Sequence, residues 1–165
     1  MQRILVIGCC GAGKSTFSKQ LSERLNLPLV QLDRLFWKPG WIEQEELIFA
    51  DLLQVELERD KWIIDGNYLK SLPLRLQYAD TVIFLDLNRW ICTWRVFKRW
   101  LFQEGYQAVG CPQKVDLPFL KFVFWDYPQS HRETVLELKE RYSNSVNWIV
   151  LNNPVAINEW MSALN

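Results

Sequence analysis

Short apolar segments alternate along this chain with segments of helical periodicity. The apolar segments are bounded by turn residues and cover Ile4–Ile7, Leu29–Leu32, Trp62–Ile64, Thr81–Leu85 and Trp148–Leu151. Strands separated by helices favour a parallel sheet, and such sheets carry helices on both faces. The pattern therefore predicts a three-layer α/β fold around a five-stranded parallel sheet.

The predicted helices lie between these strands. Phe17, Leu21 and Leu25 form one apolar stripe of a helix over Lys14–Leu25, which ends at Asn26. Further helices are expected over Glu43–Arg59, over Asn88–Phe102, within Leu117–Tyr142 with a break near Pro128, and over Asn158–Leu164.

The 165 residues suit a single domain over 1–165, without repeats or linkers. One irregular segment, Gln103–Pro118, contains two glycines and two prolines between helices rich in Arg and Lys. Irregular segments beside a site often close over substrates, so we expect a mobile flap here.

Charge and cysteine content exclude several functions. Nineteen basic residues balance nineteen acidic ones, so net charge does not favour nucleic-acid binding, although a local basic patch remains possible. The four cysteines form no CxxC pair, which argues against zinc. The single histidine, His131, is expected to be a surface or satisfied residue rather than a catalytic base.

No segment is typical of membrane insertion. The first apolar segment is followed directly by glycines, unlike a signal peptide, and Leu117–Trp125 is short and interrupted by Lys121. We expect a cytoplasmic protein. Nine tryptophans exceed what a small core needs, so some are expected to face a ligand or a homodimer interface.

The strongest motif is the segment Gly8–Ser15, GCCGAGKS, which matches GxxxxGK[ST] between an apolar strand and an amphipathic helix. Its glycines let backbone N–H groups turn toward phosphates, and the helix adds its positive N-terminal end. The predicted nucleotide contacts are Gly8, Gly11, Ala12, Gly13, Lys14, Ser15 and Thr16.

This P-loop predicts binding of ATP with Mg²⁺. Lys14 would bridge the β- and γ-phosphates, and the Ser15 hydroxyl would bind the metal. The alternative is a glycine-rich turn without a ligand. Cys9 and Cys10 are interpreted as small fillers, although a thiol near a helix N-terminus can be reactive.

Three aspartates follow predicted strands, at the sheet edge where ligands collect: Asp33, Asp65 and Asp86. Asp33 suits the orientation of an acceptor hydroxyl, and Asp65 or Asp86 suits Mg²⁺. Each could instead cap a following helix.

The helix expected over Asn88–Phe102 carries Arg89, Arg95, Lys98 and Arg99. Arg95 and Arg99 share one face and could neutralise a transferring phosphoryl group. Trp90, Trp94 and Phe97 are expected to pack inward from the other face. The alternative is a solvated cationic face, and Arg75 and Arg132 are weaker candidates for the same role.

The chain resembles the adenylate-kinase-like P-loop kinases in the order of four features. These are the P-loop, the segment WIIDGNY that ends at Tyr68, the segment FLD that ends at Asp86, and the arginine helix. With QLD ending at Asp33 and FWKPGW ending at Trp41, the chain is similar to the small bacterial proteins known as DNA topology modulation proteins, up to about Asp126.

The resemblance implies a substrate-binding helical insert at about 34–60 and a short lid at about 89–118. Asp65 and Gly66 then match an Asp-Gly pair that helps hold magnesium through water, and Arg95 and Arg99 match lid arginines. Adenylate kinases continue that pair with Phe-Pro-Arg, whereas Asn67 and Tyr68 follow here, so the usual nucleoside monophosphate contacts are in doubt.

The leading hypothesis is a small-molecule kinase whose acceptor contacts are Asp33, Trp37, Asp65, Asn67, Tyr68 and Arg75, with Lys14, Asp33, Arg95 and Arg99 as the catalytic residues. Phe36 and Trp41 would also line an aromatic acceptor pocket that suits a flat molecule such as a nucleoside.

The competing hypothesis is a nucleotide-gated regulator that binds DNA or protein. A GTPase ranks last because no NKxD motif follows the fourth strand.

Overall fold

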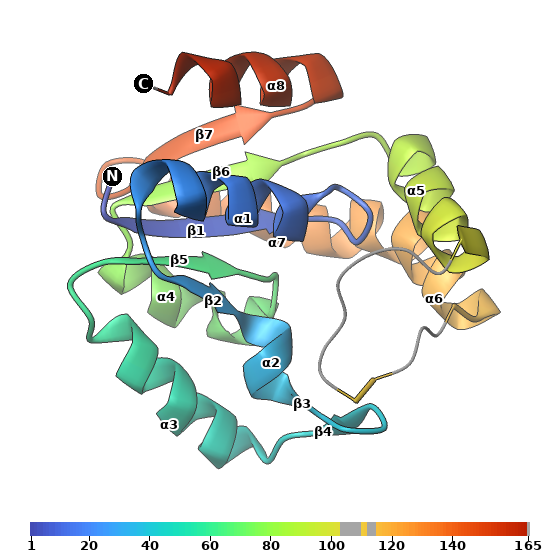
Figure 1. The fold of residues 1–165 in the computed structure, drawn as a ribbon, viewed down its shortest axis with the longest axis horizontal. Helices are drawn as coiled ribbons and strands as arrows, with labels where there is room; N and C mark the ends of the chain where they lie inside the picture. The colour runs from blue at the N-terminus through green and yellow to red at the C-terminus, as the bar shows by residue number, and fades with distance from the viewer. Residues whose placement is uncertain (103–109, 112–114, 165) are drawn as a thin grey trace.

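The computed structural model describes residues 1–102, 110–111 and 115–164. Its centre is a parallel sheet with the strand order β2-β5-β1-β6-β7 (Figure 1). The strands are β1 (Arg3–Gly8), β2 (Leu29–Gln31), β5 (Trp62–Asp65), β6 (Thr81–Leu85) and β7 (Asn147–Leu151). The predicted five-stranded parallel sheet is confirmed.

Helices cover both faces of the sheet. They are α1 (Lys14–Leu25), α2 (Leu32–Phe36), α3 (Glu46–Leu57), α4 (Leu72–Tyr78), α5 (Arg89–Phe102), α6 (Leu117–Lys121), α7 (Arg132–Arg141) and α8 (Pro154–Ala163), with a 3₁₀ turn η1 (Leu69–Ser71) and a π-helix η2 (Phe122–His131).

The alternation of side chains along β1 divides the core between the two faces. Ile4 and Val6 pack with residues of α1, α5, η2 and α8, whereas Leu5 and Ile7 pack with residues of α3, α4 and α7. All four side chains are fully buried. A strand covered on both faces has no polar side, which explains its continuous apolar sequence.

Several predicted boundaries differ from the structure. The helix expected from Glu43 begins at Glu46, because Ile42–Glu43 (β4) pairs antiparallel with Trp37–Lys38 (β3) in a small hairpin. The helix expected from Asn158 begins at Pro154, where the Asn153 side chain caps it by accepting a hydrogen bond from the Ala156 N–H at 2.8 Å.

Two further differences involve proline. Helix α4 was not predicted, although Pro73 lies at its N-terminus, where proline is tolerated. The break expected near Pro128 is a π-helical segment that contains this proline and joins α6 to α7. A π-turn accommodates a residue that cannot donate a backbone hydrogen bond.

The expected packing of the α5 aromatics is wrong. Trp90, Trp94 and Phe97 are 69%, 63% and 38% exposed, and the buried residues of α5 are Cys92 and Val96. A Cβ built on Gly11 would lie 2.3 Å from the Cys92 carbonyl oxygen, so the P-loop backbone packs closely on this side of the helix. Small side chains therefore face inward and the large rings face outward.

Most of the expected flap, 103–109 and 112–114, lies outside the described residues. Its described part contacts the β3–β4 hairpin: the Gly40 N–H donates to the Gly110 carbonyl at 2.9 Å. Within the described ranges, no helix has the length and apolar character to cross a membrane.

Candidate functional site

A cavity of about 1030 Å³ opens at the carboxyl ends of the parallel strands, where open α/β sheets bind ligands. Its walls come from the P-loop, the residues after β2 and β5, helix α5, and the segments around α6, η2 and the start of α8. All predicted P-loop contacts from Gly11 to Thr16 line it.

The P-loop has the backbone that its glycines predict. Gly11 and Gly13 have φ of 82° and 96°, a region that favours glycine, and α1 begins directly after Gly13. The loop therefore presents the N-terminus of a 12-residue helix to the cavity. Such an end attracts phosphate through its unpaired N–H groups and its dipole.

Lys14 lies within this loop, and its ammonium group donates to the Cys9 carbonyl at 3.1 Å. Burial by itself would lower the Lys14 pKa, but Cys10, Asp65 and Asp33 outweigh it and raise the pKa overall. Lys14 is therefore a permanent cation. Burial raises the pKa of the neighbouring Cys10 thiol despite Lys14, which argues against a reactive thiol at this position.

Asp65 and Ser15 fit a magnesium site. The parallel register places Asp65 beside Val6 and Gln31, and its side chain lines the cavity. Burial raises the Asp65 pKa, whereas Lys14 and a hydrogen bond with Ser15 lower it. Its Oδ1 atom is buried and has no hydrogen-bond partner within the described ranges.

An orphaned carboxylate oxygen beside a P-loop serine suits a hard cation. No group of three or more His, Cys, Asp or Glu that could hold a metal by itself occurs among the residues that the structure describes. Nucleotide-dependent Mg²⁺ sites use one or two protein oxygens, and phosphate and water complete the coordination of the metal.

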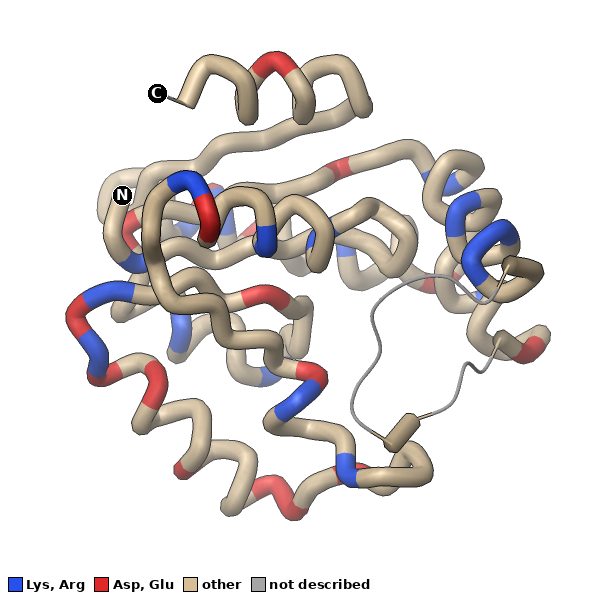
Figure 2. The backbone as a smooth tube through the Cα atoms, viewed as in Figure 1, with Lys and Arg blue, Asp and Glu red and all other residues tan. Residues whose placement is uncertain are grey.

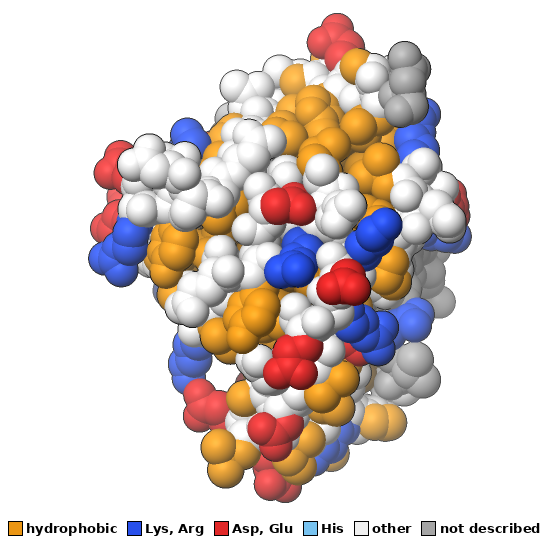
Figure 3. Space-filling model, turned by 90° about the vertical axis from the view of Figure 1, so that its left-hand side faces the viewer, with side chains coloured by type: hydrophobic (Ala, Val, Ile, Leu, Met, Phe, Trp, Pro, Cys, Tyr) orange, Lys and Arg blue, Asp and Glu red, His pale blue; other side chains and the backbone are white. Residues whose placement is uncertain are grey.

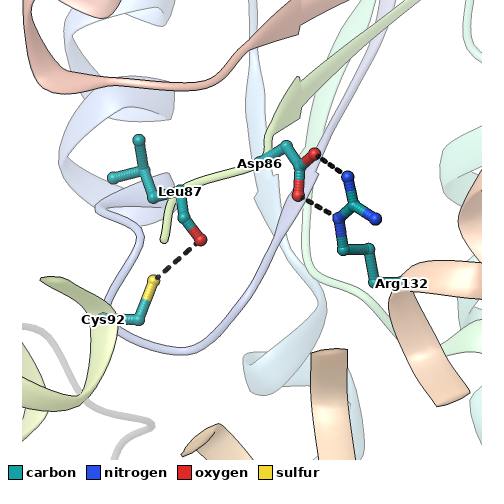
Figure 4. Close-up of polar contacts among 4 residues, drawn as sticks. All are labelled: Asp86, Leu87, Cys92 and Arg132. Carbon is teal, nitrogen blue, oxygen red and sulfur yellow. Dashed lines mark hydrogen bonds and ion pairs between the residues drawn. The ribbon is translucent and has the colours of Figure 1, made fainter. Parts of the chain in front are cut away.

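Asp86 does not face this site. Figure 4 shows its carboxylate paired with Arg132 at the start of α7, with Nε–Oδ1 and Nη2–Oδ2 distances of 2.8 Å each. This bidentate pair raises the Arg132 pKa. Neither residue lines the cavity, so the pair joins β6 to α7, and Asp65 is the better magnesium candidate of the two aspartates.

Asn67 binds the first residue of the P-loop, and Arg75 binds the segment that contains Asn67. The Asn67 side chain accepts from the Gly8 N–H at 2.8 Å and donates to the Gly8 carbonyl at 2.6 Å. Arg75 is fully buried and donates to the carbonyls of Gly66, Asn67 and Tyr68. Asn67 lines the cavity with its amide bound to Gly8, and Arg75 does not line the cavity.

Asp33, Trp37 and Tyr68 lie together at the cavity wall, as expected for an acceptor pocket. The Tyr68 hydroxyl donates to Asp33 Oδ1 at 2.7 Å, and burial together with Asp33 raises the Tyr68 pKa. The ring of Trp41 lies 5.4 Å from that of Trp37. Phe36 instead packs edge-on against Trp37 and against Phe49 of α3, behind this wall.

Helix α5 directs two of its cations at the P-loop. Arg95 Nη1 donates to the Ala12 carbonyl at 3.2 Å, and Arg95 and Arg99 both line the cavity. Lys98 is exposed and Arg89 lies over the Phe124 ring at 5.6 Å. Figure 2 shows that α5 is rich in Lys and Arg. The predicted single ridge divides into a cavity side, with Arg95 and Arg99, and an outer side.

Sequence reasoning missed the opposite wall of the cavity. Phe119, Phe122, His131, Pro154, Ile157 and Asn158 line it. His131 is partly buried, stacks on Tyr127 with a centroid distance of 5.8 Å, and has its Nδ1 atom 3.0 Å from the Ser130 hydroxyl oxygen. The turn residues Asn152 to Pro154 after the last strand could have indicated this wall, because they too end a parallel strand at the ligand edge.

Comparison with solved structures identifies the fold. The chain is similar to a kinase candidate from Chloroflexus aurantiacus J-10-fl, with a TM-score of 0.59 and 17% identity over 98% of this chain and 97% of that one. It is also similar to shikimate kinase from Acinetobacter baumannii in complex with shikimate, with a TM-score of 0.64 and 15% identity over 98% and 89%.

A third match is shikimate kinase from Bacteroides thetaiotaomicron, with a TM-score of 0.50 and 18% identity over 99% and 95% of the two chains. No protein-family model and no curated protein matches the sequence. At these identities the likeness shows the fold alone, an α/β fold shared with these kinases, and leaves the reaction to be argued from the site.

Proposed function

We propose that this chain is an ATP-dependent kinase that phosphorylates a hydroxyl group of a small molecule. The observation that carries this proposal is one cavity that is lined by both a P-loop lysine, Lys14, and a carboxylate, Asp33, in the first turn of α2 after β2. If the glycine-rich turn had only a structural role, neither the arginines of α5 nor Asp33 would be needed at the same cavity.

The strand order gives each part of the cavity a role. The ends of β2 and β5 lie on one side of the P-loop, and the segment after β7 lies on the other. The triphosphate would lie on the P-loop and the base between Phe119, Pro154 and Ile157. The acceptor would lie beside Asp33, Trp37 and Tyr68.

The residues of the chain support an in-line transfer. Asp33 would orient the acceptor hydroxyl and take its proton as the oxygen attacks the γ-phosphorus, while the bond from that phosphorus to the β–γ bridging oxygen breaks and ADP leaves. Lys14, Arg95 and Arg99 would stabilise the charge on the transferring group. Ser15 and Asp65 would hold Mg²⁺, which neutralises phosphate charge when bound.

The regulator that binds DNA has less support. Arg95 and Arg99, the proposed DNA contacts, line the cavity and do not form an outer ridge. On the face shown in Figure 3, which lies opposite α5, Lys and Arg side chains are mixed with Asp and Glu. If the Arg99→Ala variant retained DNA as well as the wild type does, the result would agree with the kinase hypothesis and not with the regulator hypothesis.

The test is ADP production from ATP and Mg²⁺ with nucleosides, nucleoside monophosphates and small hydroxylated metabolites as acceptors. Acceptor-dependent ADP that disappears in Lys14→Ala would support the kinase. Asp33→Asn should remove transfer and retain ATP binding, while Asp51→Asn, on the exposed side of α3, should behave as the wild type. ATP binding without acceptor-dependent ADP would contradict the proposal.

Self-association remains a further proposal. Trp90, Trp94 and Leu101 are 69%, 63% and 58% exposed on α5, and aromatic residues of this kind are enriched at protein interfaces. Light scattering after size exclusion should give a dimer mass for the wild type and a monomer mass for Trp94→Glu. A monomer at every concentration tested would contradict this.

A further inference from the structure

The cavity is asymmetric in charge. The acceptor side, formed by residues after β2 and β5, contains Asp33 and Asp65 together with Trp37, Trp41 and Tyr68. Among the described residues that line the cavity, the Lys and Arg side chains are Lys14, Arg95 and Arg99, which come from the P-loop and α5. None of the lining cations belongs to the acceptor side.

The phosphates of a bound nucleotide would pair with these three cations. Lys14 and Arg95 already contact P-loop carbonyls, at Cys9 and Ala12, and so lie where the phosphates would bind. A triphosphate with its Mg²⁺ would pair with Lys14, Arg95 and Arg99, and these are the lysine and arginine side chains of the described lining. A phosphate or carboxylate on the acceptor would add negative charge without a matching cation in the described lining, at a large desolvation cost.

The acceptor wall itself attracts positive charge. Asp33 is held by the Tyr68 hydroxyl at 2.7 Å, and Tyr68 stays protonated because burial and Asp33 raise its pKa. The rings of Trp37 and Trp41 meet nearly edge to face at 76° beside this pair. A carboxylate among aromatic faces favours a neutral hydroxylated ring or an ammonium group over an anion.

We infer that the acceptor carries no negative charge: it is an uncharged or cationic alcohol with a flat or ammonium-bearing part. This inference rests on the proposed kinase activity and narrows its substrate class. It separates this chain from kinases whose acceptors are nucleoside monophosphates or hydroxy acids, including the solved neighbour that binds shikimate.

Acceptors that share a ring and a hydroxyl but differ in charge test the inference. Nucleosides are compared with their 5′-monophosphates, and 4-(aminomethyl)benzyl alcohol with 4-carboxybenzyl alcohol, by quenching of tryptophan fluorescence and by ADP production. We expect each uncharged or cationic member to bind at least about tenfold more tightly than its anionic partner, which corresponds to about 1.4 kcal/mol.

A charge added to the acceptor wall provides the matched control. Leu69 lines the cavity on this side, so Leu69→Arg should raise the relative affinity of the anionic member about tenfold or more, and Leu69→Gln should not. Equal or tighter binding of the anionic members by the wild type would overturn the inference and leave the kinase proposal intact. No acceptor-dependent ADP with any compound, despite ATP binding, would instead overturn the kinase proposal and the inference with it.

Discussion

Asn67 illustrates how a residue beside the site acts through its neighbours. Its amide forms both an accepting and a donating hydrogen bond with the backbone of Gly8, the first residue of the P-loop. From the sequence, Asn67 was expected to contact substrate as part of the segment Asp65–Tyr68, and the structure adds this contact with the P-loop backbone. A sequence pattern locates a residue at the ligand edge but does not show which partner its side chain selects.

Asn67→Ala should lower the free energy of unfolding by about 1–3 kcal/mol, because it leaves a buried N–H and a carbonyl of Gly8 without partners. It should also weaken ATP binding through the displaced loop. Urea unfolding and nucleotide titration measure the two effects. Asn144→Ala, at an exposed position, serves as the control. If Asn67→Ala unfolded at the same urea concentration as the wild type, its contact with Gly8 would not stabilise the P-loop.

At the scale of elements, the contact between the P-loop and α5 determines which residues reach the cavity. A Cβ built on Gly11 would lie 2.3 Å from the Cys92 carbonyl oxygen and 3.0 Å from a methyl carbon of Val96. With this side of α5 seated on the loop, Arg95 and Arg99 point into the cavity and the tryptophans point outward.

A comparison of the Gly11→Ala and Gly40→Ala variants separates the stability lost through this contact from the stability lost through backbone strain. Both glycines have nearly the same φ, 82° and 83°, so each alanine is strained by about 1–2 kcal/mol. A Cβ at Gly40 meets nothing within 4 Å, whereas the one at Gly11 clashes with backbone. We expect Gly11→Ala to lose about 2 kcal/mol more stability than Gly40→Ala in urea unfolding, along with ATP binding. Equal losses would show that α5 does not seat on the loop.

The sequence predicted the elements whose pattern is local and missed those set by tertiary contact. Five strands, the P-loop helix and Asp65 at the sheet edge follow from apolar runs and a motif. The β3–β4 hairpin does not, because strands of two residues are too short to show a period. The outward face of α5 does not, because the P-loop that the helix covers lies far away in sequence. The partner of Asp86, Arg132, is 46 residues distant for the same reason.

At the scale of the whole molecule, the cavity exists because distant strand ends meet at one edge of the sheet. The residues after β2, β5 and β7 and the P-loop after β1 all contribute to it. Ligand binding at this edge should therefore stabilise the fold as a unit, by about 2.7 kcal/mol at a ligand concentration one hundred times Kd.

Thermal unfolding can separate the nucleotide and metal contributions to this stabilisation. ATP with Mg²⁺ should raise the Tm of the wild type, and removal of Mg²⁺ by a chelator should reverse part of the rise. In Asp65→Asn the chelator should make little difference, because the orphaned carboxylate beside Ser15 is the proposed metal contact. In Lys14→Ala the rise itself should be lost.

Asp86→Asn is the matched control, because it removes an equivalent carboxylate at the end of the next strand along the chain. Its starting Tm should be lower, since Arg132 loses a bidentate partner, but its Mg²⁺-dependent rise should match that of the wild type. The opposite pattern, with the chelator effect lost in Asp86→Asn and kept in Asp65→Asn, would assign the metal to Asp86. Because both variants keep the shape of the side chain, the comparison measures the carboxylate charge at each strand end.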